Sequence, residues 1–146
     1  MEKQMSKYMA YCGLYCGACW SMICHDKQEG VESAVELHTD ADEQPCGGCR
    51  DAHQSQCEFV VCNQAHGTEC CAFCPEFPCQ RIKEFSQEEW EHHQVVLANL
   101  QRIRETGVEN WLQEQAEYWS CPACGCRTKW YQESCSRCGG TISRRI

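Results

Sequence analysis

The chain has 146 residues, a formal net charge of −8 and 17 cysteines, and without those cysteines its apolar share falls from 42% to about 30%. So little apolar material excludes a large hydrophobic core, and the fold therefore needs disulfides or metal ions as staples. The N-terminus lacks the apolar run of a signal peptide, and no stretch is long and apolar enough to span a membrane. These features predict a cytoplasmic protein with reduced thiols, and the odd cysteine count also favours metal ligation over a disulfide framework.

Residues 1–83 form the first of three predicted parts, a cysteine-rich metal-binding domain with little regular structure. Cys-x-x-Cys pairs recur at residues 16–19, 46–49 and 71–74, and thiols at that spacing lie on one tight turn and can hold a single soft metal ion. The candidate ligands of this part are Cys12, Cys16, Cys19, Cys46, Cys49, Cys57, Cys62, Cys71, Cys74 and Cys79. Cys24 and Cys70 are weaker candidates. The twelve thiols can complete two or three four-coordinate sites, but their spacing leaves open which cysteines share an ion.

Residues 84–119 contain no cysteine and predict two helices. Ser86-Gln-Glu-Glu89 has the pattern of a capping box, which predicts that a helix starts there. Three- and four-residue spacing then places on one apolar stripe Trp90, His93, Val96, Leu97, Leu100 and Ile103. Gly107 predicts the end of this helix. A second helix is expected to place on one side Val108, Trp111, Leu112 and Trp119.

Residues 120–146 have the spacing of a zinc ribbon, with a predicted β-hairpin between two metal-binding turns. The expected ligands are Cys121, Cys124, Cys135 and Cys138. Four thiolates leave zinc no open position, so the pattern indicates a structural ion. The hairpin aromatics Trp130 and Tyr131 are expected to form a small core of the ribbon. Cys126 is a spare thiol, at most an alternate ligand.

Charge separates the ribbon from the rest of the chain. From Cys121 onward there are five basic residues and one acidic residue, a formal charge of +4, so the preceding residues carry −12. Nucleic acid is disfavoured as a partner, because the acidic part repels phosphates, and any contact is expected through the basic ribbon alone. The groups available for it are Arg127, Lys129, Arg144, Arg145, Trp130 and Tyr131.

The spacing leaves the identity of the metal open. Four cysteines can hold a [4Fe–4S] cluster as readily as zinc, and Cys74-Pro75 has the Cys-Pro order that recurs in ferredoxins. Cys12-x3-Cys16-x2-Cys19 matches the cluster motif of radical SAM enzymes, but the chain is too short for their barrel and lacks its strand–helix alternation. The sequence also contains no phosphate-binding loop, nucleophile elbow or His-Glu-x-x-His motif, and it indicates no catalytic residues.

Three longer motifs resemble a known family. These are Cys12-Gly-Leu-Tyr-Cys-Gly-Ala-Cys19, Cys46-Gly-Gly-Cys-Arg50 and Cys71-Ala-Phe-Cys-Pro-Glu-Phe-Pro-Cys79. They are similar to the prokaryotic cysteine-rich domain-of-unknown-function family 3795 over about the first eighty residues, and some members continue with similar helices and a ribbon. The resemblance implies a cytoplasmic, zinc-binding protein and implies no activity. Cys24, Cys70 and Cys126 are additional to the family's pattern.

The sequence thus predicts a small, metal-stabilised fold of α-helices and irregular structure. A cysteine-rich multi-metal domain (1–83) precedes two helices (84–119) and a C-terminal β zinc ribbon (120–146). We expect a zinc-binding structural or interaction protein with about three ions, in which metals replace a hydrophobic core. The alternative is an iron–sulfur electron carrier, or a redox or metal-handling protein, with a [4Fe–4S] cluster in the N-terminal domain. A protein partner is expected rather than a membrane.

Overall fold

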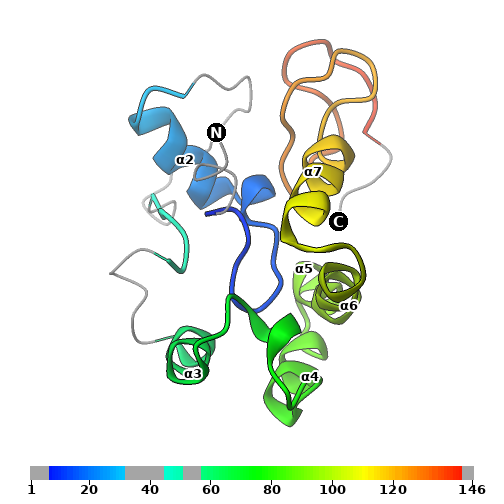
Figure 1. The fold of residues 1–146 in the computed structure, drawn as a ribbon. Coiled ribbons are helices and arrows are strands. Elements are labelled where there is room, and N and C mark those ends of the chain that lie inside the picture. The colour runs from blue at the N-terminus through cyan, green and yellow to red at the C-terminus, as the bar shows by residue number, and fades with distance from the viewer. Residues whose placement is uncertain (1–6, 32–44, 51–56, 143–146) are drawn as a thin grey trace.

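A computed structural model describes residues 7–31, 45–50 and 57–142, and their regular structure is helical (Figure 1). Two short 3-10 turns are η1 (Cys16–Ala18) and η3 (Cys71–Phe73). The α-helices are α2 (Trp20–Gln28), α3 (Glu58–His66), α4 (Gln80–Ser86), α5 (Glu91–Gln94), α6 (Val96–Thr106) and α7 (Val108–Tyr118). Helix α2 and the orange-to-red C-terminal segment lie at one end of the molecule, whereas α3 and α4 lie at the other.

Helices α6 and α7 confirm the main helical prediction. The chain breaks between them at Gly107, whose φ of 90° is open to glycine but strained for other residues. The predicted stripe residues Val96, Leu100 and Ile103 are fully buried. Trp111 and Leu112 of α7 are buried as well, so both helices turn their apolar stripes to the core.

The predicted start of the first helix is wrong. Ser86 caps nothing; it is the last residue of α4, and its hydroxyl donates a hydrogen bond to the Lys83 carbonyl at 2.7 Å. The chain turns after α4, and a separate short helix, α5, begins after Trp90. Trp90 consequently lies outside the stripe and is 53% exposed. The capping-box pattern failed because a serine in the last turn of a helix can bond backward to a carbonyl instead.

The cysteine-rich part has more regular structure than the sequence predicted. Helices α2, α3 and α4 each begin directly after a cysteine, and the residues at their N-caps are Cys19, Cys57 and Cys79. These helices have no more than nine residues, so the apolar periodicity that identifies longer helices is weak in them. Each of these candidate ligands therefore lies where a helix begins.

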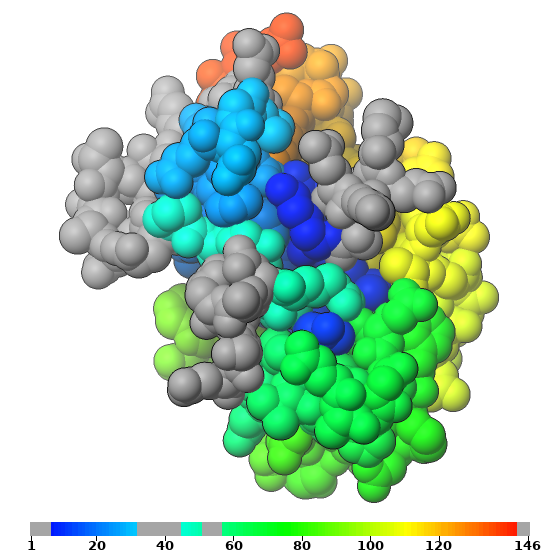
Figure 2. Space-filling model, turned by 60° about the vertical axis from the view of Figure 1, so that its left-hand side comes forward, coloured from blue at the N-terminus to red at the C-terminus, as the bar shows by residue number. Residues whose placement is uncertain are grey.

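The N-terminal segment between Tyr8 and Cys19 runs through the centre of the molecule. Its backbone is hydrogen-bonded to distant parts of the chain: the Cys71 N–H donates to the Tyr11 carbonyl at 2.8 Å, and the Trp130 N–H donates to the Ala18 carbonyl at 3.0 Å. The Asn99 amide of α6 donates to the Gly13 carbonyl at 2.9 Å. Figure 2 shows blue atoms of this segment between α2, in lighter blue, and the green of α3 and α4.

One hydrophobic core combines all three predicted parts of the chain. Its buried members include Met9, Tyr15, Ile82, Leu100, Ile103, Trp111, Trp119 and Trp130. The central segment approaches α6 so closely that a Cβ atom on Gly13 would lie 2.7 Å from Cγ of Leu100. This core is larger than the apolar composition of residues 1–83 predicted, because α6, α7 and Trp130 supply much of it.

The C-terminal segment lacks the predicted β-hairpin strands within the described residues. It forms the isolated antiparallel bridges Ser120–Arg127 and Ser134–Thr141. The expected small core of Trp130 and Tyr131 is also wrong: Trp130 is 5% exposed and packs outside the ribbon, stacked on His92 at a centroid distance of 4.4 Å. The small apolar cluster of the ribbon itself consists of Cys121, Cys135, Ile142 and Cys126.

A fully buried carboxylate ties this segment to the N-terminal part. Asp26 of α2 lies 2.6 Å from Nζ of Lys7, 2.6 Å from the Tyr8 hydroxyl and 2.8 Å from Nη1 of Arg127. Burial alone would raise the pKa of Asp26, but hydrogen bonds from Lys7, Tyr8 and Arg127 outweigh it, so the pKa lies below its usual value. Arg127 also donates from Nε to the Gly17 carbonyl at 2.8 Å.

The first prediction concerns this carboxylate. Asp26→Asn leaves two cations without their buried counter-charge, so we expect the free energy of unfolding to fall by about 3 kcal/mol. Denaturant unfolding of the full chain at a fixed zinc concentration measures this loss. Glu29→Gln, next to α2 and exposed, is the control and should change stability by no more than about 0.5 kcal/mol. Equal stability of the two variants would contradict the role assigned to Asp26.

His92 occupies a second buried polar position, between α5 and the ribbon. Its Nδ1 lies 2.8 Å from the Tyr131 hydroxyl, which also accepts a hydrogen bond from the His92 backbone N–H. The other rings around the imidazole are those of His93, Trp20, Trp90 and Trp130. Burial, and then the neighbouring His93, lower the pKa of His92 to about 4.

The second prediction is a loss of stability in mild acid that depends on His92. Below a pH of about 6.5 the unfolded chain protonates His92, whereas the folded chain keeps this imidazole neutral until about pH 4. The free energy of unfolding therefore falls as the pH is lowered between these two values. When the pH is lowered from about 7 to about 5.5 at a fixed zinc concentration, the free energy of unfolding should fall by about 1 kcal/mol more in the wild type than in His92→Gln. An identical pH dependence in both proteins would contradict it.

Candidate metal centres

The four ribbon cysteines form one compact group of metal-binding atoms among the described residues. The four Sγ atoms of Cys121, Cys124, Cys135 and Cys138 all lie within 4.8 Å of one another. The Cys121–Cys138 and Cys124–Cys135 sulfur pairs are each 3.6 Å apart. Tetrahedral zinc with bonds of about 2.3 Å holds its sulfurs about 3.8 Å apart, so the group fits one such ion with little adjustment.

Backbone N–H groups point at these sulfurs. The Arg137 N–H donates to Sγ of Cys135 and the Gly140 N–H donates to Sγ of Cys138, each at 3.4 Å. The Cys138 N–H, then the thiol of Cys126 and the Arg137 N–H, lower the pKa of Cys135 to about 6. Donors of this kind offset the negative charge that thiolates bring to a metal site.

We call the group of four ribbon cysteines the ribbon centre. Cys126 is a fifth thiol beside it. Its Sγ lies 3.1 Å from Sγ of Cys135, closer than the two pairs across the centre. Burial, and then hydrogen bonds to Cys135 and Cys124, raise the pKa of Cys126 to about 12. The sequence offered one signal for it, the tight Cys-Gly-Cys spacing after Cys124, but spacing alone did not show which way its side chain points.

A second group of soft donors surrounds a cavity of about 20 Å³ at the other end of the molecule. The donors that line this cavity centre are Cys62, His66, Cys71, Cys74 and Cys79. They come from α3, from η3 and the turn after it, and from the N-cap of α4. This volume is close to that of one water-sized sphere, so the cavity has room for a single ion.

His66 is a donor that the sequence analysis did not select. Its Nδ1 lies 3.7 Å from Sγ of Cys62 and 2.7 Å from the Cys62 carbonyl oxygen. Donor atoms of His66, Cys74 and Glu76 all lie within 4.8 Å of one another. When Nδ1 donates to the carbonyl, Nε2 is left to accept a metal, an arrangement common for ligating histidines.

Asn63 supports the cavity centre from behind. Its side-chain amide is buried and donates to Sγ of Cys71 at 3.3 Å and to the Phe59 carbonyl at 2.7 Å. Its oxygen accepts a hydrogen bond from the Thr68 hydroxyl at 2.6 Å. These bonds fix the amide in one orientation and aim a donor at a candidate ligand.

A third group of thiols, which we call the buried group, lies on and beside the central segment; Cys12 is buried and the others are half-buried. Burial raises the pKa of Cys16 well above its usual value, and the neighbouring thiols that raise it further are those of Cys19, Cys49, Cys12 and Cys46. Cys57 acts in the same way on Cys12 and Cys49. The Tyr11 N–H donates to Sγ of Cys49 at 3.2 Å, and the Gly48 N–H donates to Sγ of Cys46 at 3.4 Å.

The structure therefore groups the predicted ligands into three neighbourhoods, and two of them adjoin, because the Cys71 thiol of the cavity centre also raises the pKa of Cys12 in the buried group. Cys24 on α2 belongs to none of them, and Cys70 is a buried neighbour of Cys71. Every cysteine is a free thiol, which agrees with the expectation of metal ligation over disulfides. The free thiols and their grouping are compatible with metal binding but leave the kind of metal open.

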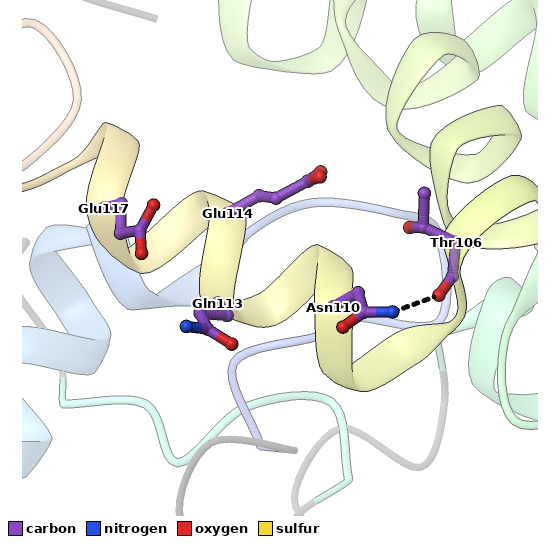
Figure 3. A pocket seen from close by; sticks show the side chains of 5 residues that line it. All are labelled: Thr106, Asn110, Gln113, Glu114 and Glu117. Carbon is purple, nitrogen blue, oxygen red and sulfur yellow. Dashed lines mark hydrogen bonds between the residues drawn. The ribbon is translucent and has the colours of Figure 1, made fainter.

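A further hollow among the described residues is lined by neither cysteine nor histidine. Figure 3 shows this hollow of about 250 Å³ on the outer face of α7, lined by Thr106, Asn110, Gln113, Glu114 and Glu117. The Asn110 amide is bonded to the Thr106 carbonyl, and Glu114 pairs with Arg102 at 2.6 Å. The side chains of Asn110 and Glu114 are occupied by these contacts, and the lining offers no nucleophile paired with a base.

The N-terminal part of the chain matches a known protein family. Residues 8–84 match a family described as "Protein of unknown function (DUF3795)". The chain belongs to this family. The DUF3795 match contains both N-terminal thiol groups and ends at Glu84 in α4. It confirms the family resemblance predicted from the three motifs. The ribbon lies outside the matched residues. No curated protein matches the chain, and no solved structure matches it.

No helix among the described residues is long and apolar enough to cross a membrane. This agrees with the sequence, in which no apolar stretch reaches that length.

The third prediction concerns the DUF3795 part and its cavity centre. Asn63→Ala removes the amide that is bonded to Cys71, so the affinity of this centre for zinc should fall about 10- to 100-fold. Competition with a chromophoric chelator measures the affinity. Gln64→Ala is the matched control, because Gln64 is the exposed neighbour on α3. If both variants retain zinc equally, Asn63 does not support a metal site.

Proposed function

We propose that this protein is a zinc-binding structural or interaction protein in which bound ions hold together the part of the fold that apolar side chains do not. The observation that carries the proposal is the ribbon centre, where four thiols are already gathered at nearly the spacing of tetrahedral zinc. Four thiolates would close the coordination shell, which supports a structural ion. The boundaries 1–83, 84–119 and 120–146 stay part of this proposal.

Two further ions are proposed for the N-terminal part. The cavity centre would hold one, with Cys62, Cys71, Cys74 and Cys79 as ligands or with His66 replacing one thiol. The buried group would hold another, with ligands drawn from Cys12, Cys16, Cys19, Cys46, Cys49 and Cys57. Helix α3 supports this view, because only Val60 and Asn63 of its residues are buried, so few apolar contacts hold it in place.

A second candidate function is that of an iron–sulfur electron carrier, or a redox or metal-handling protein. It is favoured by the buried group alone, which contains more neighbouring thiols than one zinc ion requires. The cavity centre supports single ions, since about 20 Å³ has no room for a multi-atom cluster. A [4Fe–4S] cluster is therefore proposed, as the alternative, for the buried group.

The proposed partner is another protein in the cytoplasm. Nucleic acid is disfavoured by contacts between the ribbon and the rest of the chain as well as by charge. Trp130 is buried against His92, and Arg127 is paired with Asp26, so neither is free to meet a base or a phosphate. Arg144 and Arg145 lie outside the described residues.

The fourth prediction tests metal content and colour together. Protein purified without oxygen or chelator should contain about three zinc ions per chain and absorb little visible light. Elemental analysis and an absorption spectrum measure both. Iron with broad visible absorption would support the cluster alternative, and one metal ion or none per chain would contradict both candidate functions.

Chelation provides the control for the structural role. Removal of the ions should collapse the NMR dispersion of residues 1–83, because ordering the backbone costs about 1–2 kcal/mol per residue and few apolar contacts there offset that cost. Some helical signal from α6 and α7 should persist. Unchanged dispersion after complete removal would show that the ions are not needed for the fold.

A further inference from the structure

We propose that Cys126 and Cys135 form an oxidation site, in which a hydroperoxide converts the two thiols to a disulfide and the ribbon centre releases its metal. The proposal rests on the zinc-binding function proposed above. It adds a modification site and names its oxidant class, and it gives a role to a thiol that lies outside the four-cysteine pattern of a zinc ribbon.

The first support is the position of the fifth sulfur. Zinc takes four thiolates, so one of the five ribbon thiols has no place in the coordination shell. Cys126 is that thiol by sequence spacing, and its sulfur already touches Sγ of Cys135 at 3.1 Å. A second thiol beside an oxidisable one is the arrangement found in redox-sensing proteins.

The second support is that neighbouring contacts hold Cys126 in this position. Its carbonyl accepts a hydrogen bond from the Cys121 N–H at 2.7 Å, and the bridge between Ser120 and Arg127 closes the same turn. The next residue, Arg127, is anchored to Gly17 and Asp26. The side chain also packs in the small cluster with Cys121, Cys135 and Ile142. Little backbone movement is therefore needed to join the two sulfurs.

The reaction balances with one hydrogen peroxide. The thiolate of Cys135 attacks one peroxide oxygen, the O–O bond breaks, and hydroxide leaves, so that Cys135 becomes a sulfenic acid. The sulfur of Cys126 then attacks Sγ of Cys135, the S–O bond breaks, and the second hydroxide leaves with the proton of the Cys126 thiol as water. Two thiols have lost two electrons to the peroxide, and Cys135 is no longer a thiolate ligand.

Metal release follows from ligand loss and from exposure. After the disulfide forms, the thiolates left for the ion are those of Cys121, Cys124 and Cys138. Cys135 itself is buried, but Cys124 and Cys138 beside it are exposed, so peroxide and water can approach the centre along them and water can take the fourth position. A site with three thiolates and an open position binds zinc less tightly than a closed one.

The test uses the zinc-loaded full chain as wild type, Cys126→Ser and Cys24→Ser. Cys24 is the matched control because it is also partly buried and belongs to none of the thiol groups. Each protein is exposed to hydrogen peroxide while a chromophoric chelator reports released zinc. Tryptic mapping with fragmentation then locates disulfides between the peptides 105–127, which contains Cys126, and 130–137, which contains Cys135.

We expect the wild type and Cys24→Ser to form the Cys126–Cys135 disulfide and to release the ribbon ion at equal rates. Cys126→Ser should release that ion about tenfold more slowly. Dithiol reduction of the oxidised wild type should restore its zinc content. Cys126→Ala serves as a second variant if serine disturbs folding, and the wild-type disulfide map requires no variant.

Two results overturn the proposal, and they differ from failure of the proposed function. Equal release from Cys126→Ser and the wild type would do so, as would a wild-type map in which Cys135 pairs with Cys121, Cys124 or Cys138. Both leave the zinc centre intact as a proposal. A ribbon that holds no zinc before peroxide is added would overturn the zinc function and this inference together.

Discussion

The buried carboxylate of Asp26 is the interaction on which the arrangement of the chain depends. A charge without access to water must be paired, and its partners come from near the N-terminus, Lys7 and Tyr8, and from the ribbon, Arg127. Arg127 also binds the Gly17 carbonyl, inside the Cys16–Cys19 turn of the buried group. The ribbon is therefore fastened to the first cysteine turn of the chain, and two of the thiol groups share a common support.

Apolar side chains and thiols are concentrated in different parts of the fold. Leu100, Ile103 and Trp111 of α6 and α7 fill the core beneath the central segment, where burial in water-excluded contacts is the stabilising term. Helix α3 buries only Val60 and Asn63, and it contributes Cys62 and His66 to the lining of the small cavity. Much of the hydrophobic core thus comes from the part of the sequence that is periodic, and the candidate metal ligands come from the parts that are rich in cysteine.

This division also explains what the sequence could predict. Helices α6 and α7 were predictable because their apolar residues repeat over three turns and Gly107 separates them. Helices α2 and α3 were not, since both are short and each follows a candidate ligand in a part for which the sequence predicted little regular structure. The ribbon ligands followed from spacing, whereas the approach of Cys126 to Cys135 and the burial of Trp130 against His92 are tertiary contacts that no local pattern encodes.

Further contacts pack the DUF3795 part against the rest of the chain. The family match ends at Glu84, but Gly13 packs against Leu100, its carbonyl is bonded to Asn99, and Trp130 packs against Trp20. Without α6, α7 and the ribbon, the central segment would expose apolar surface and lose partners for its backbone carbonyls. Composition separates the chain into three parts, but burial joins them, and the later parts complete the core that the cysteine-rich part begins.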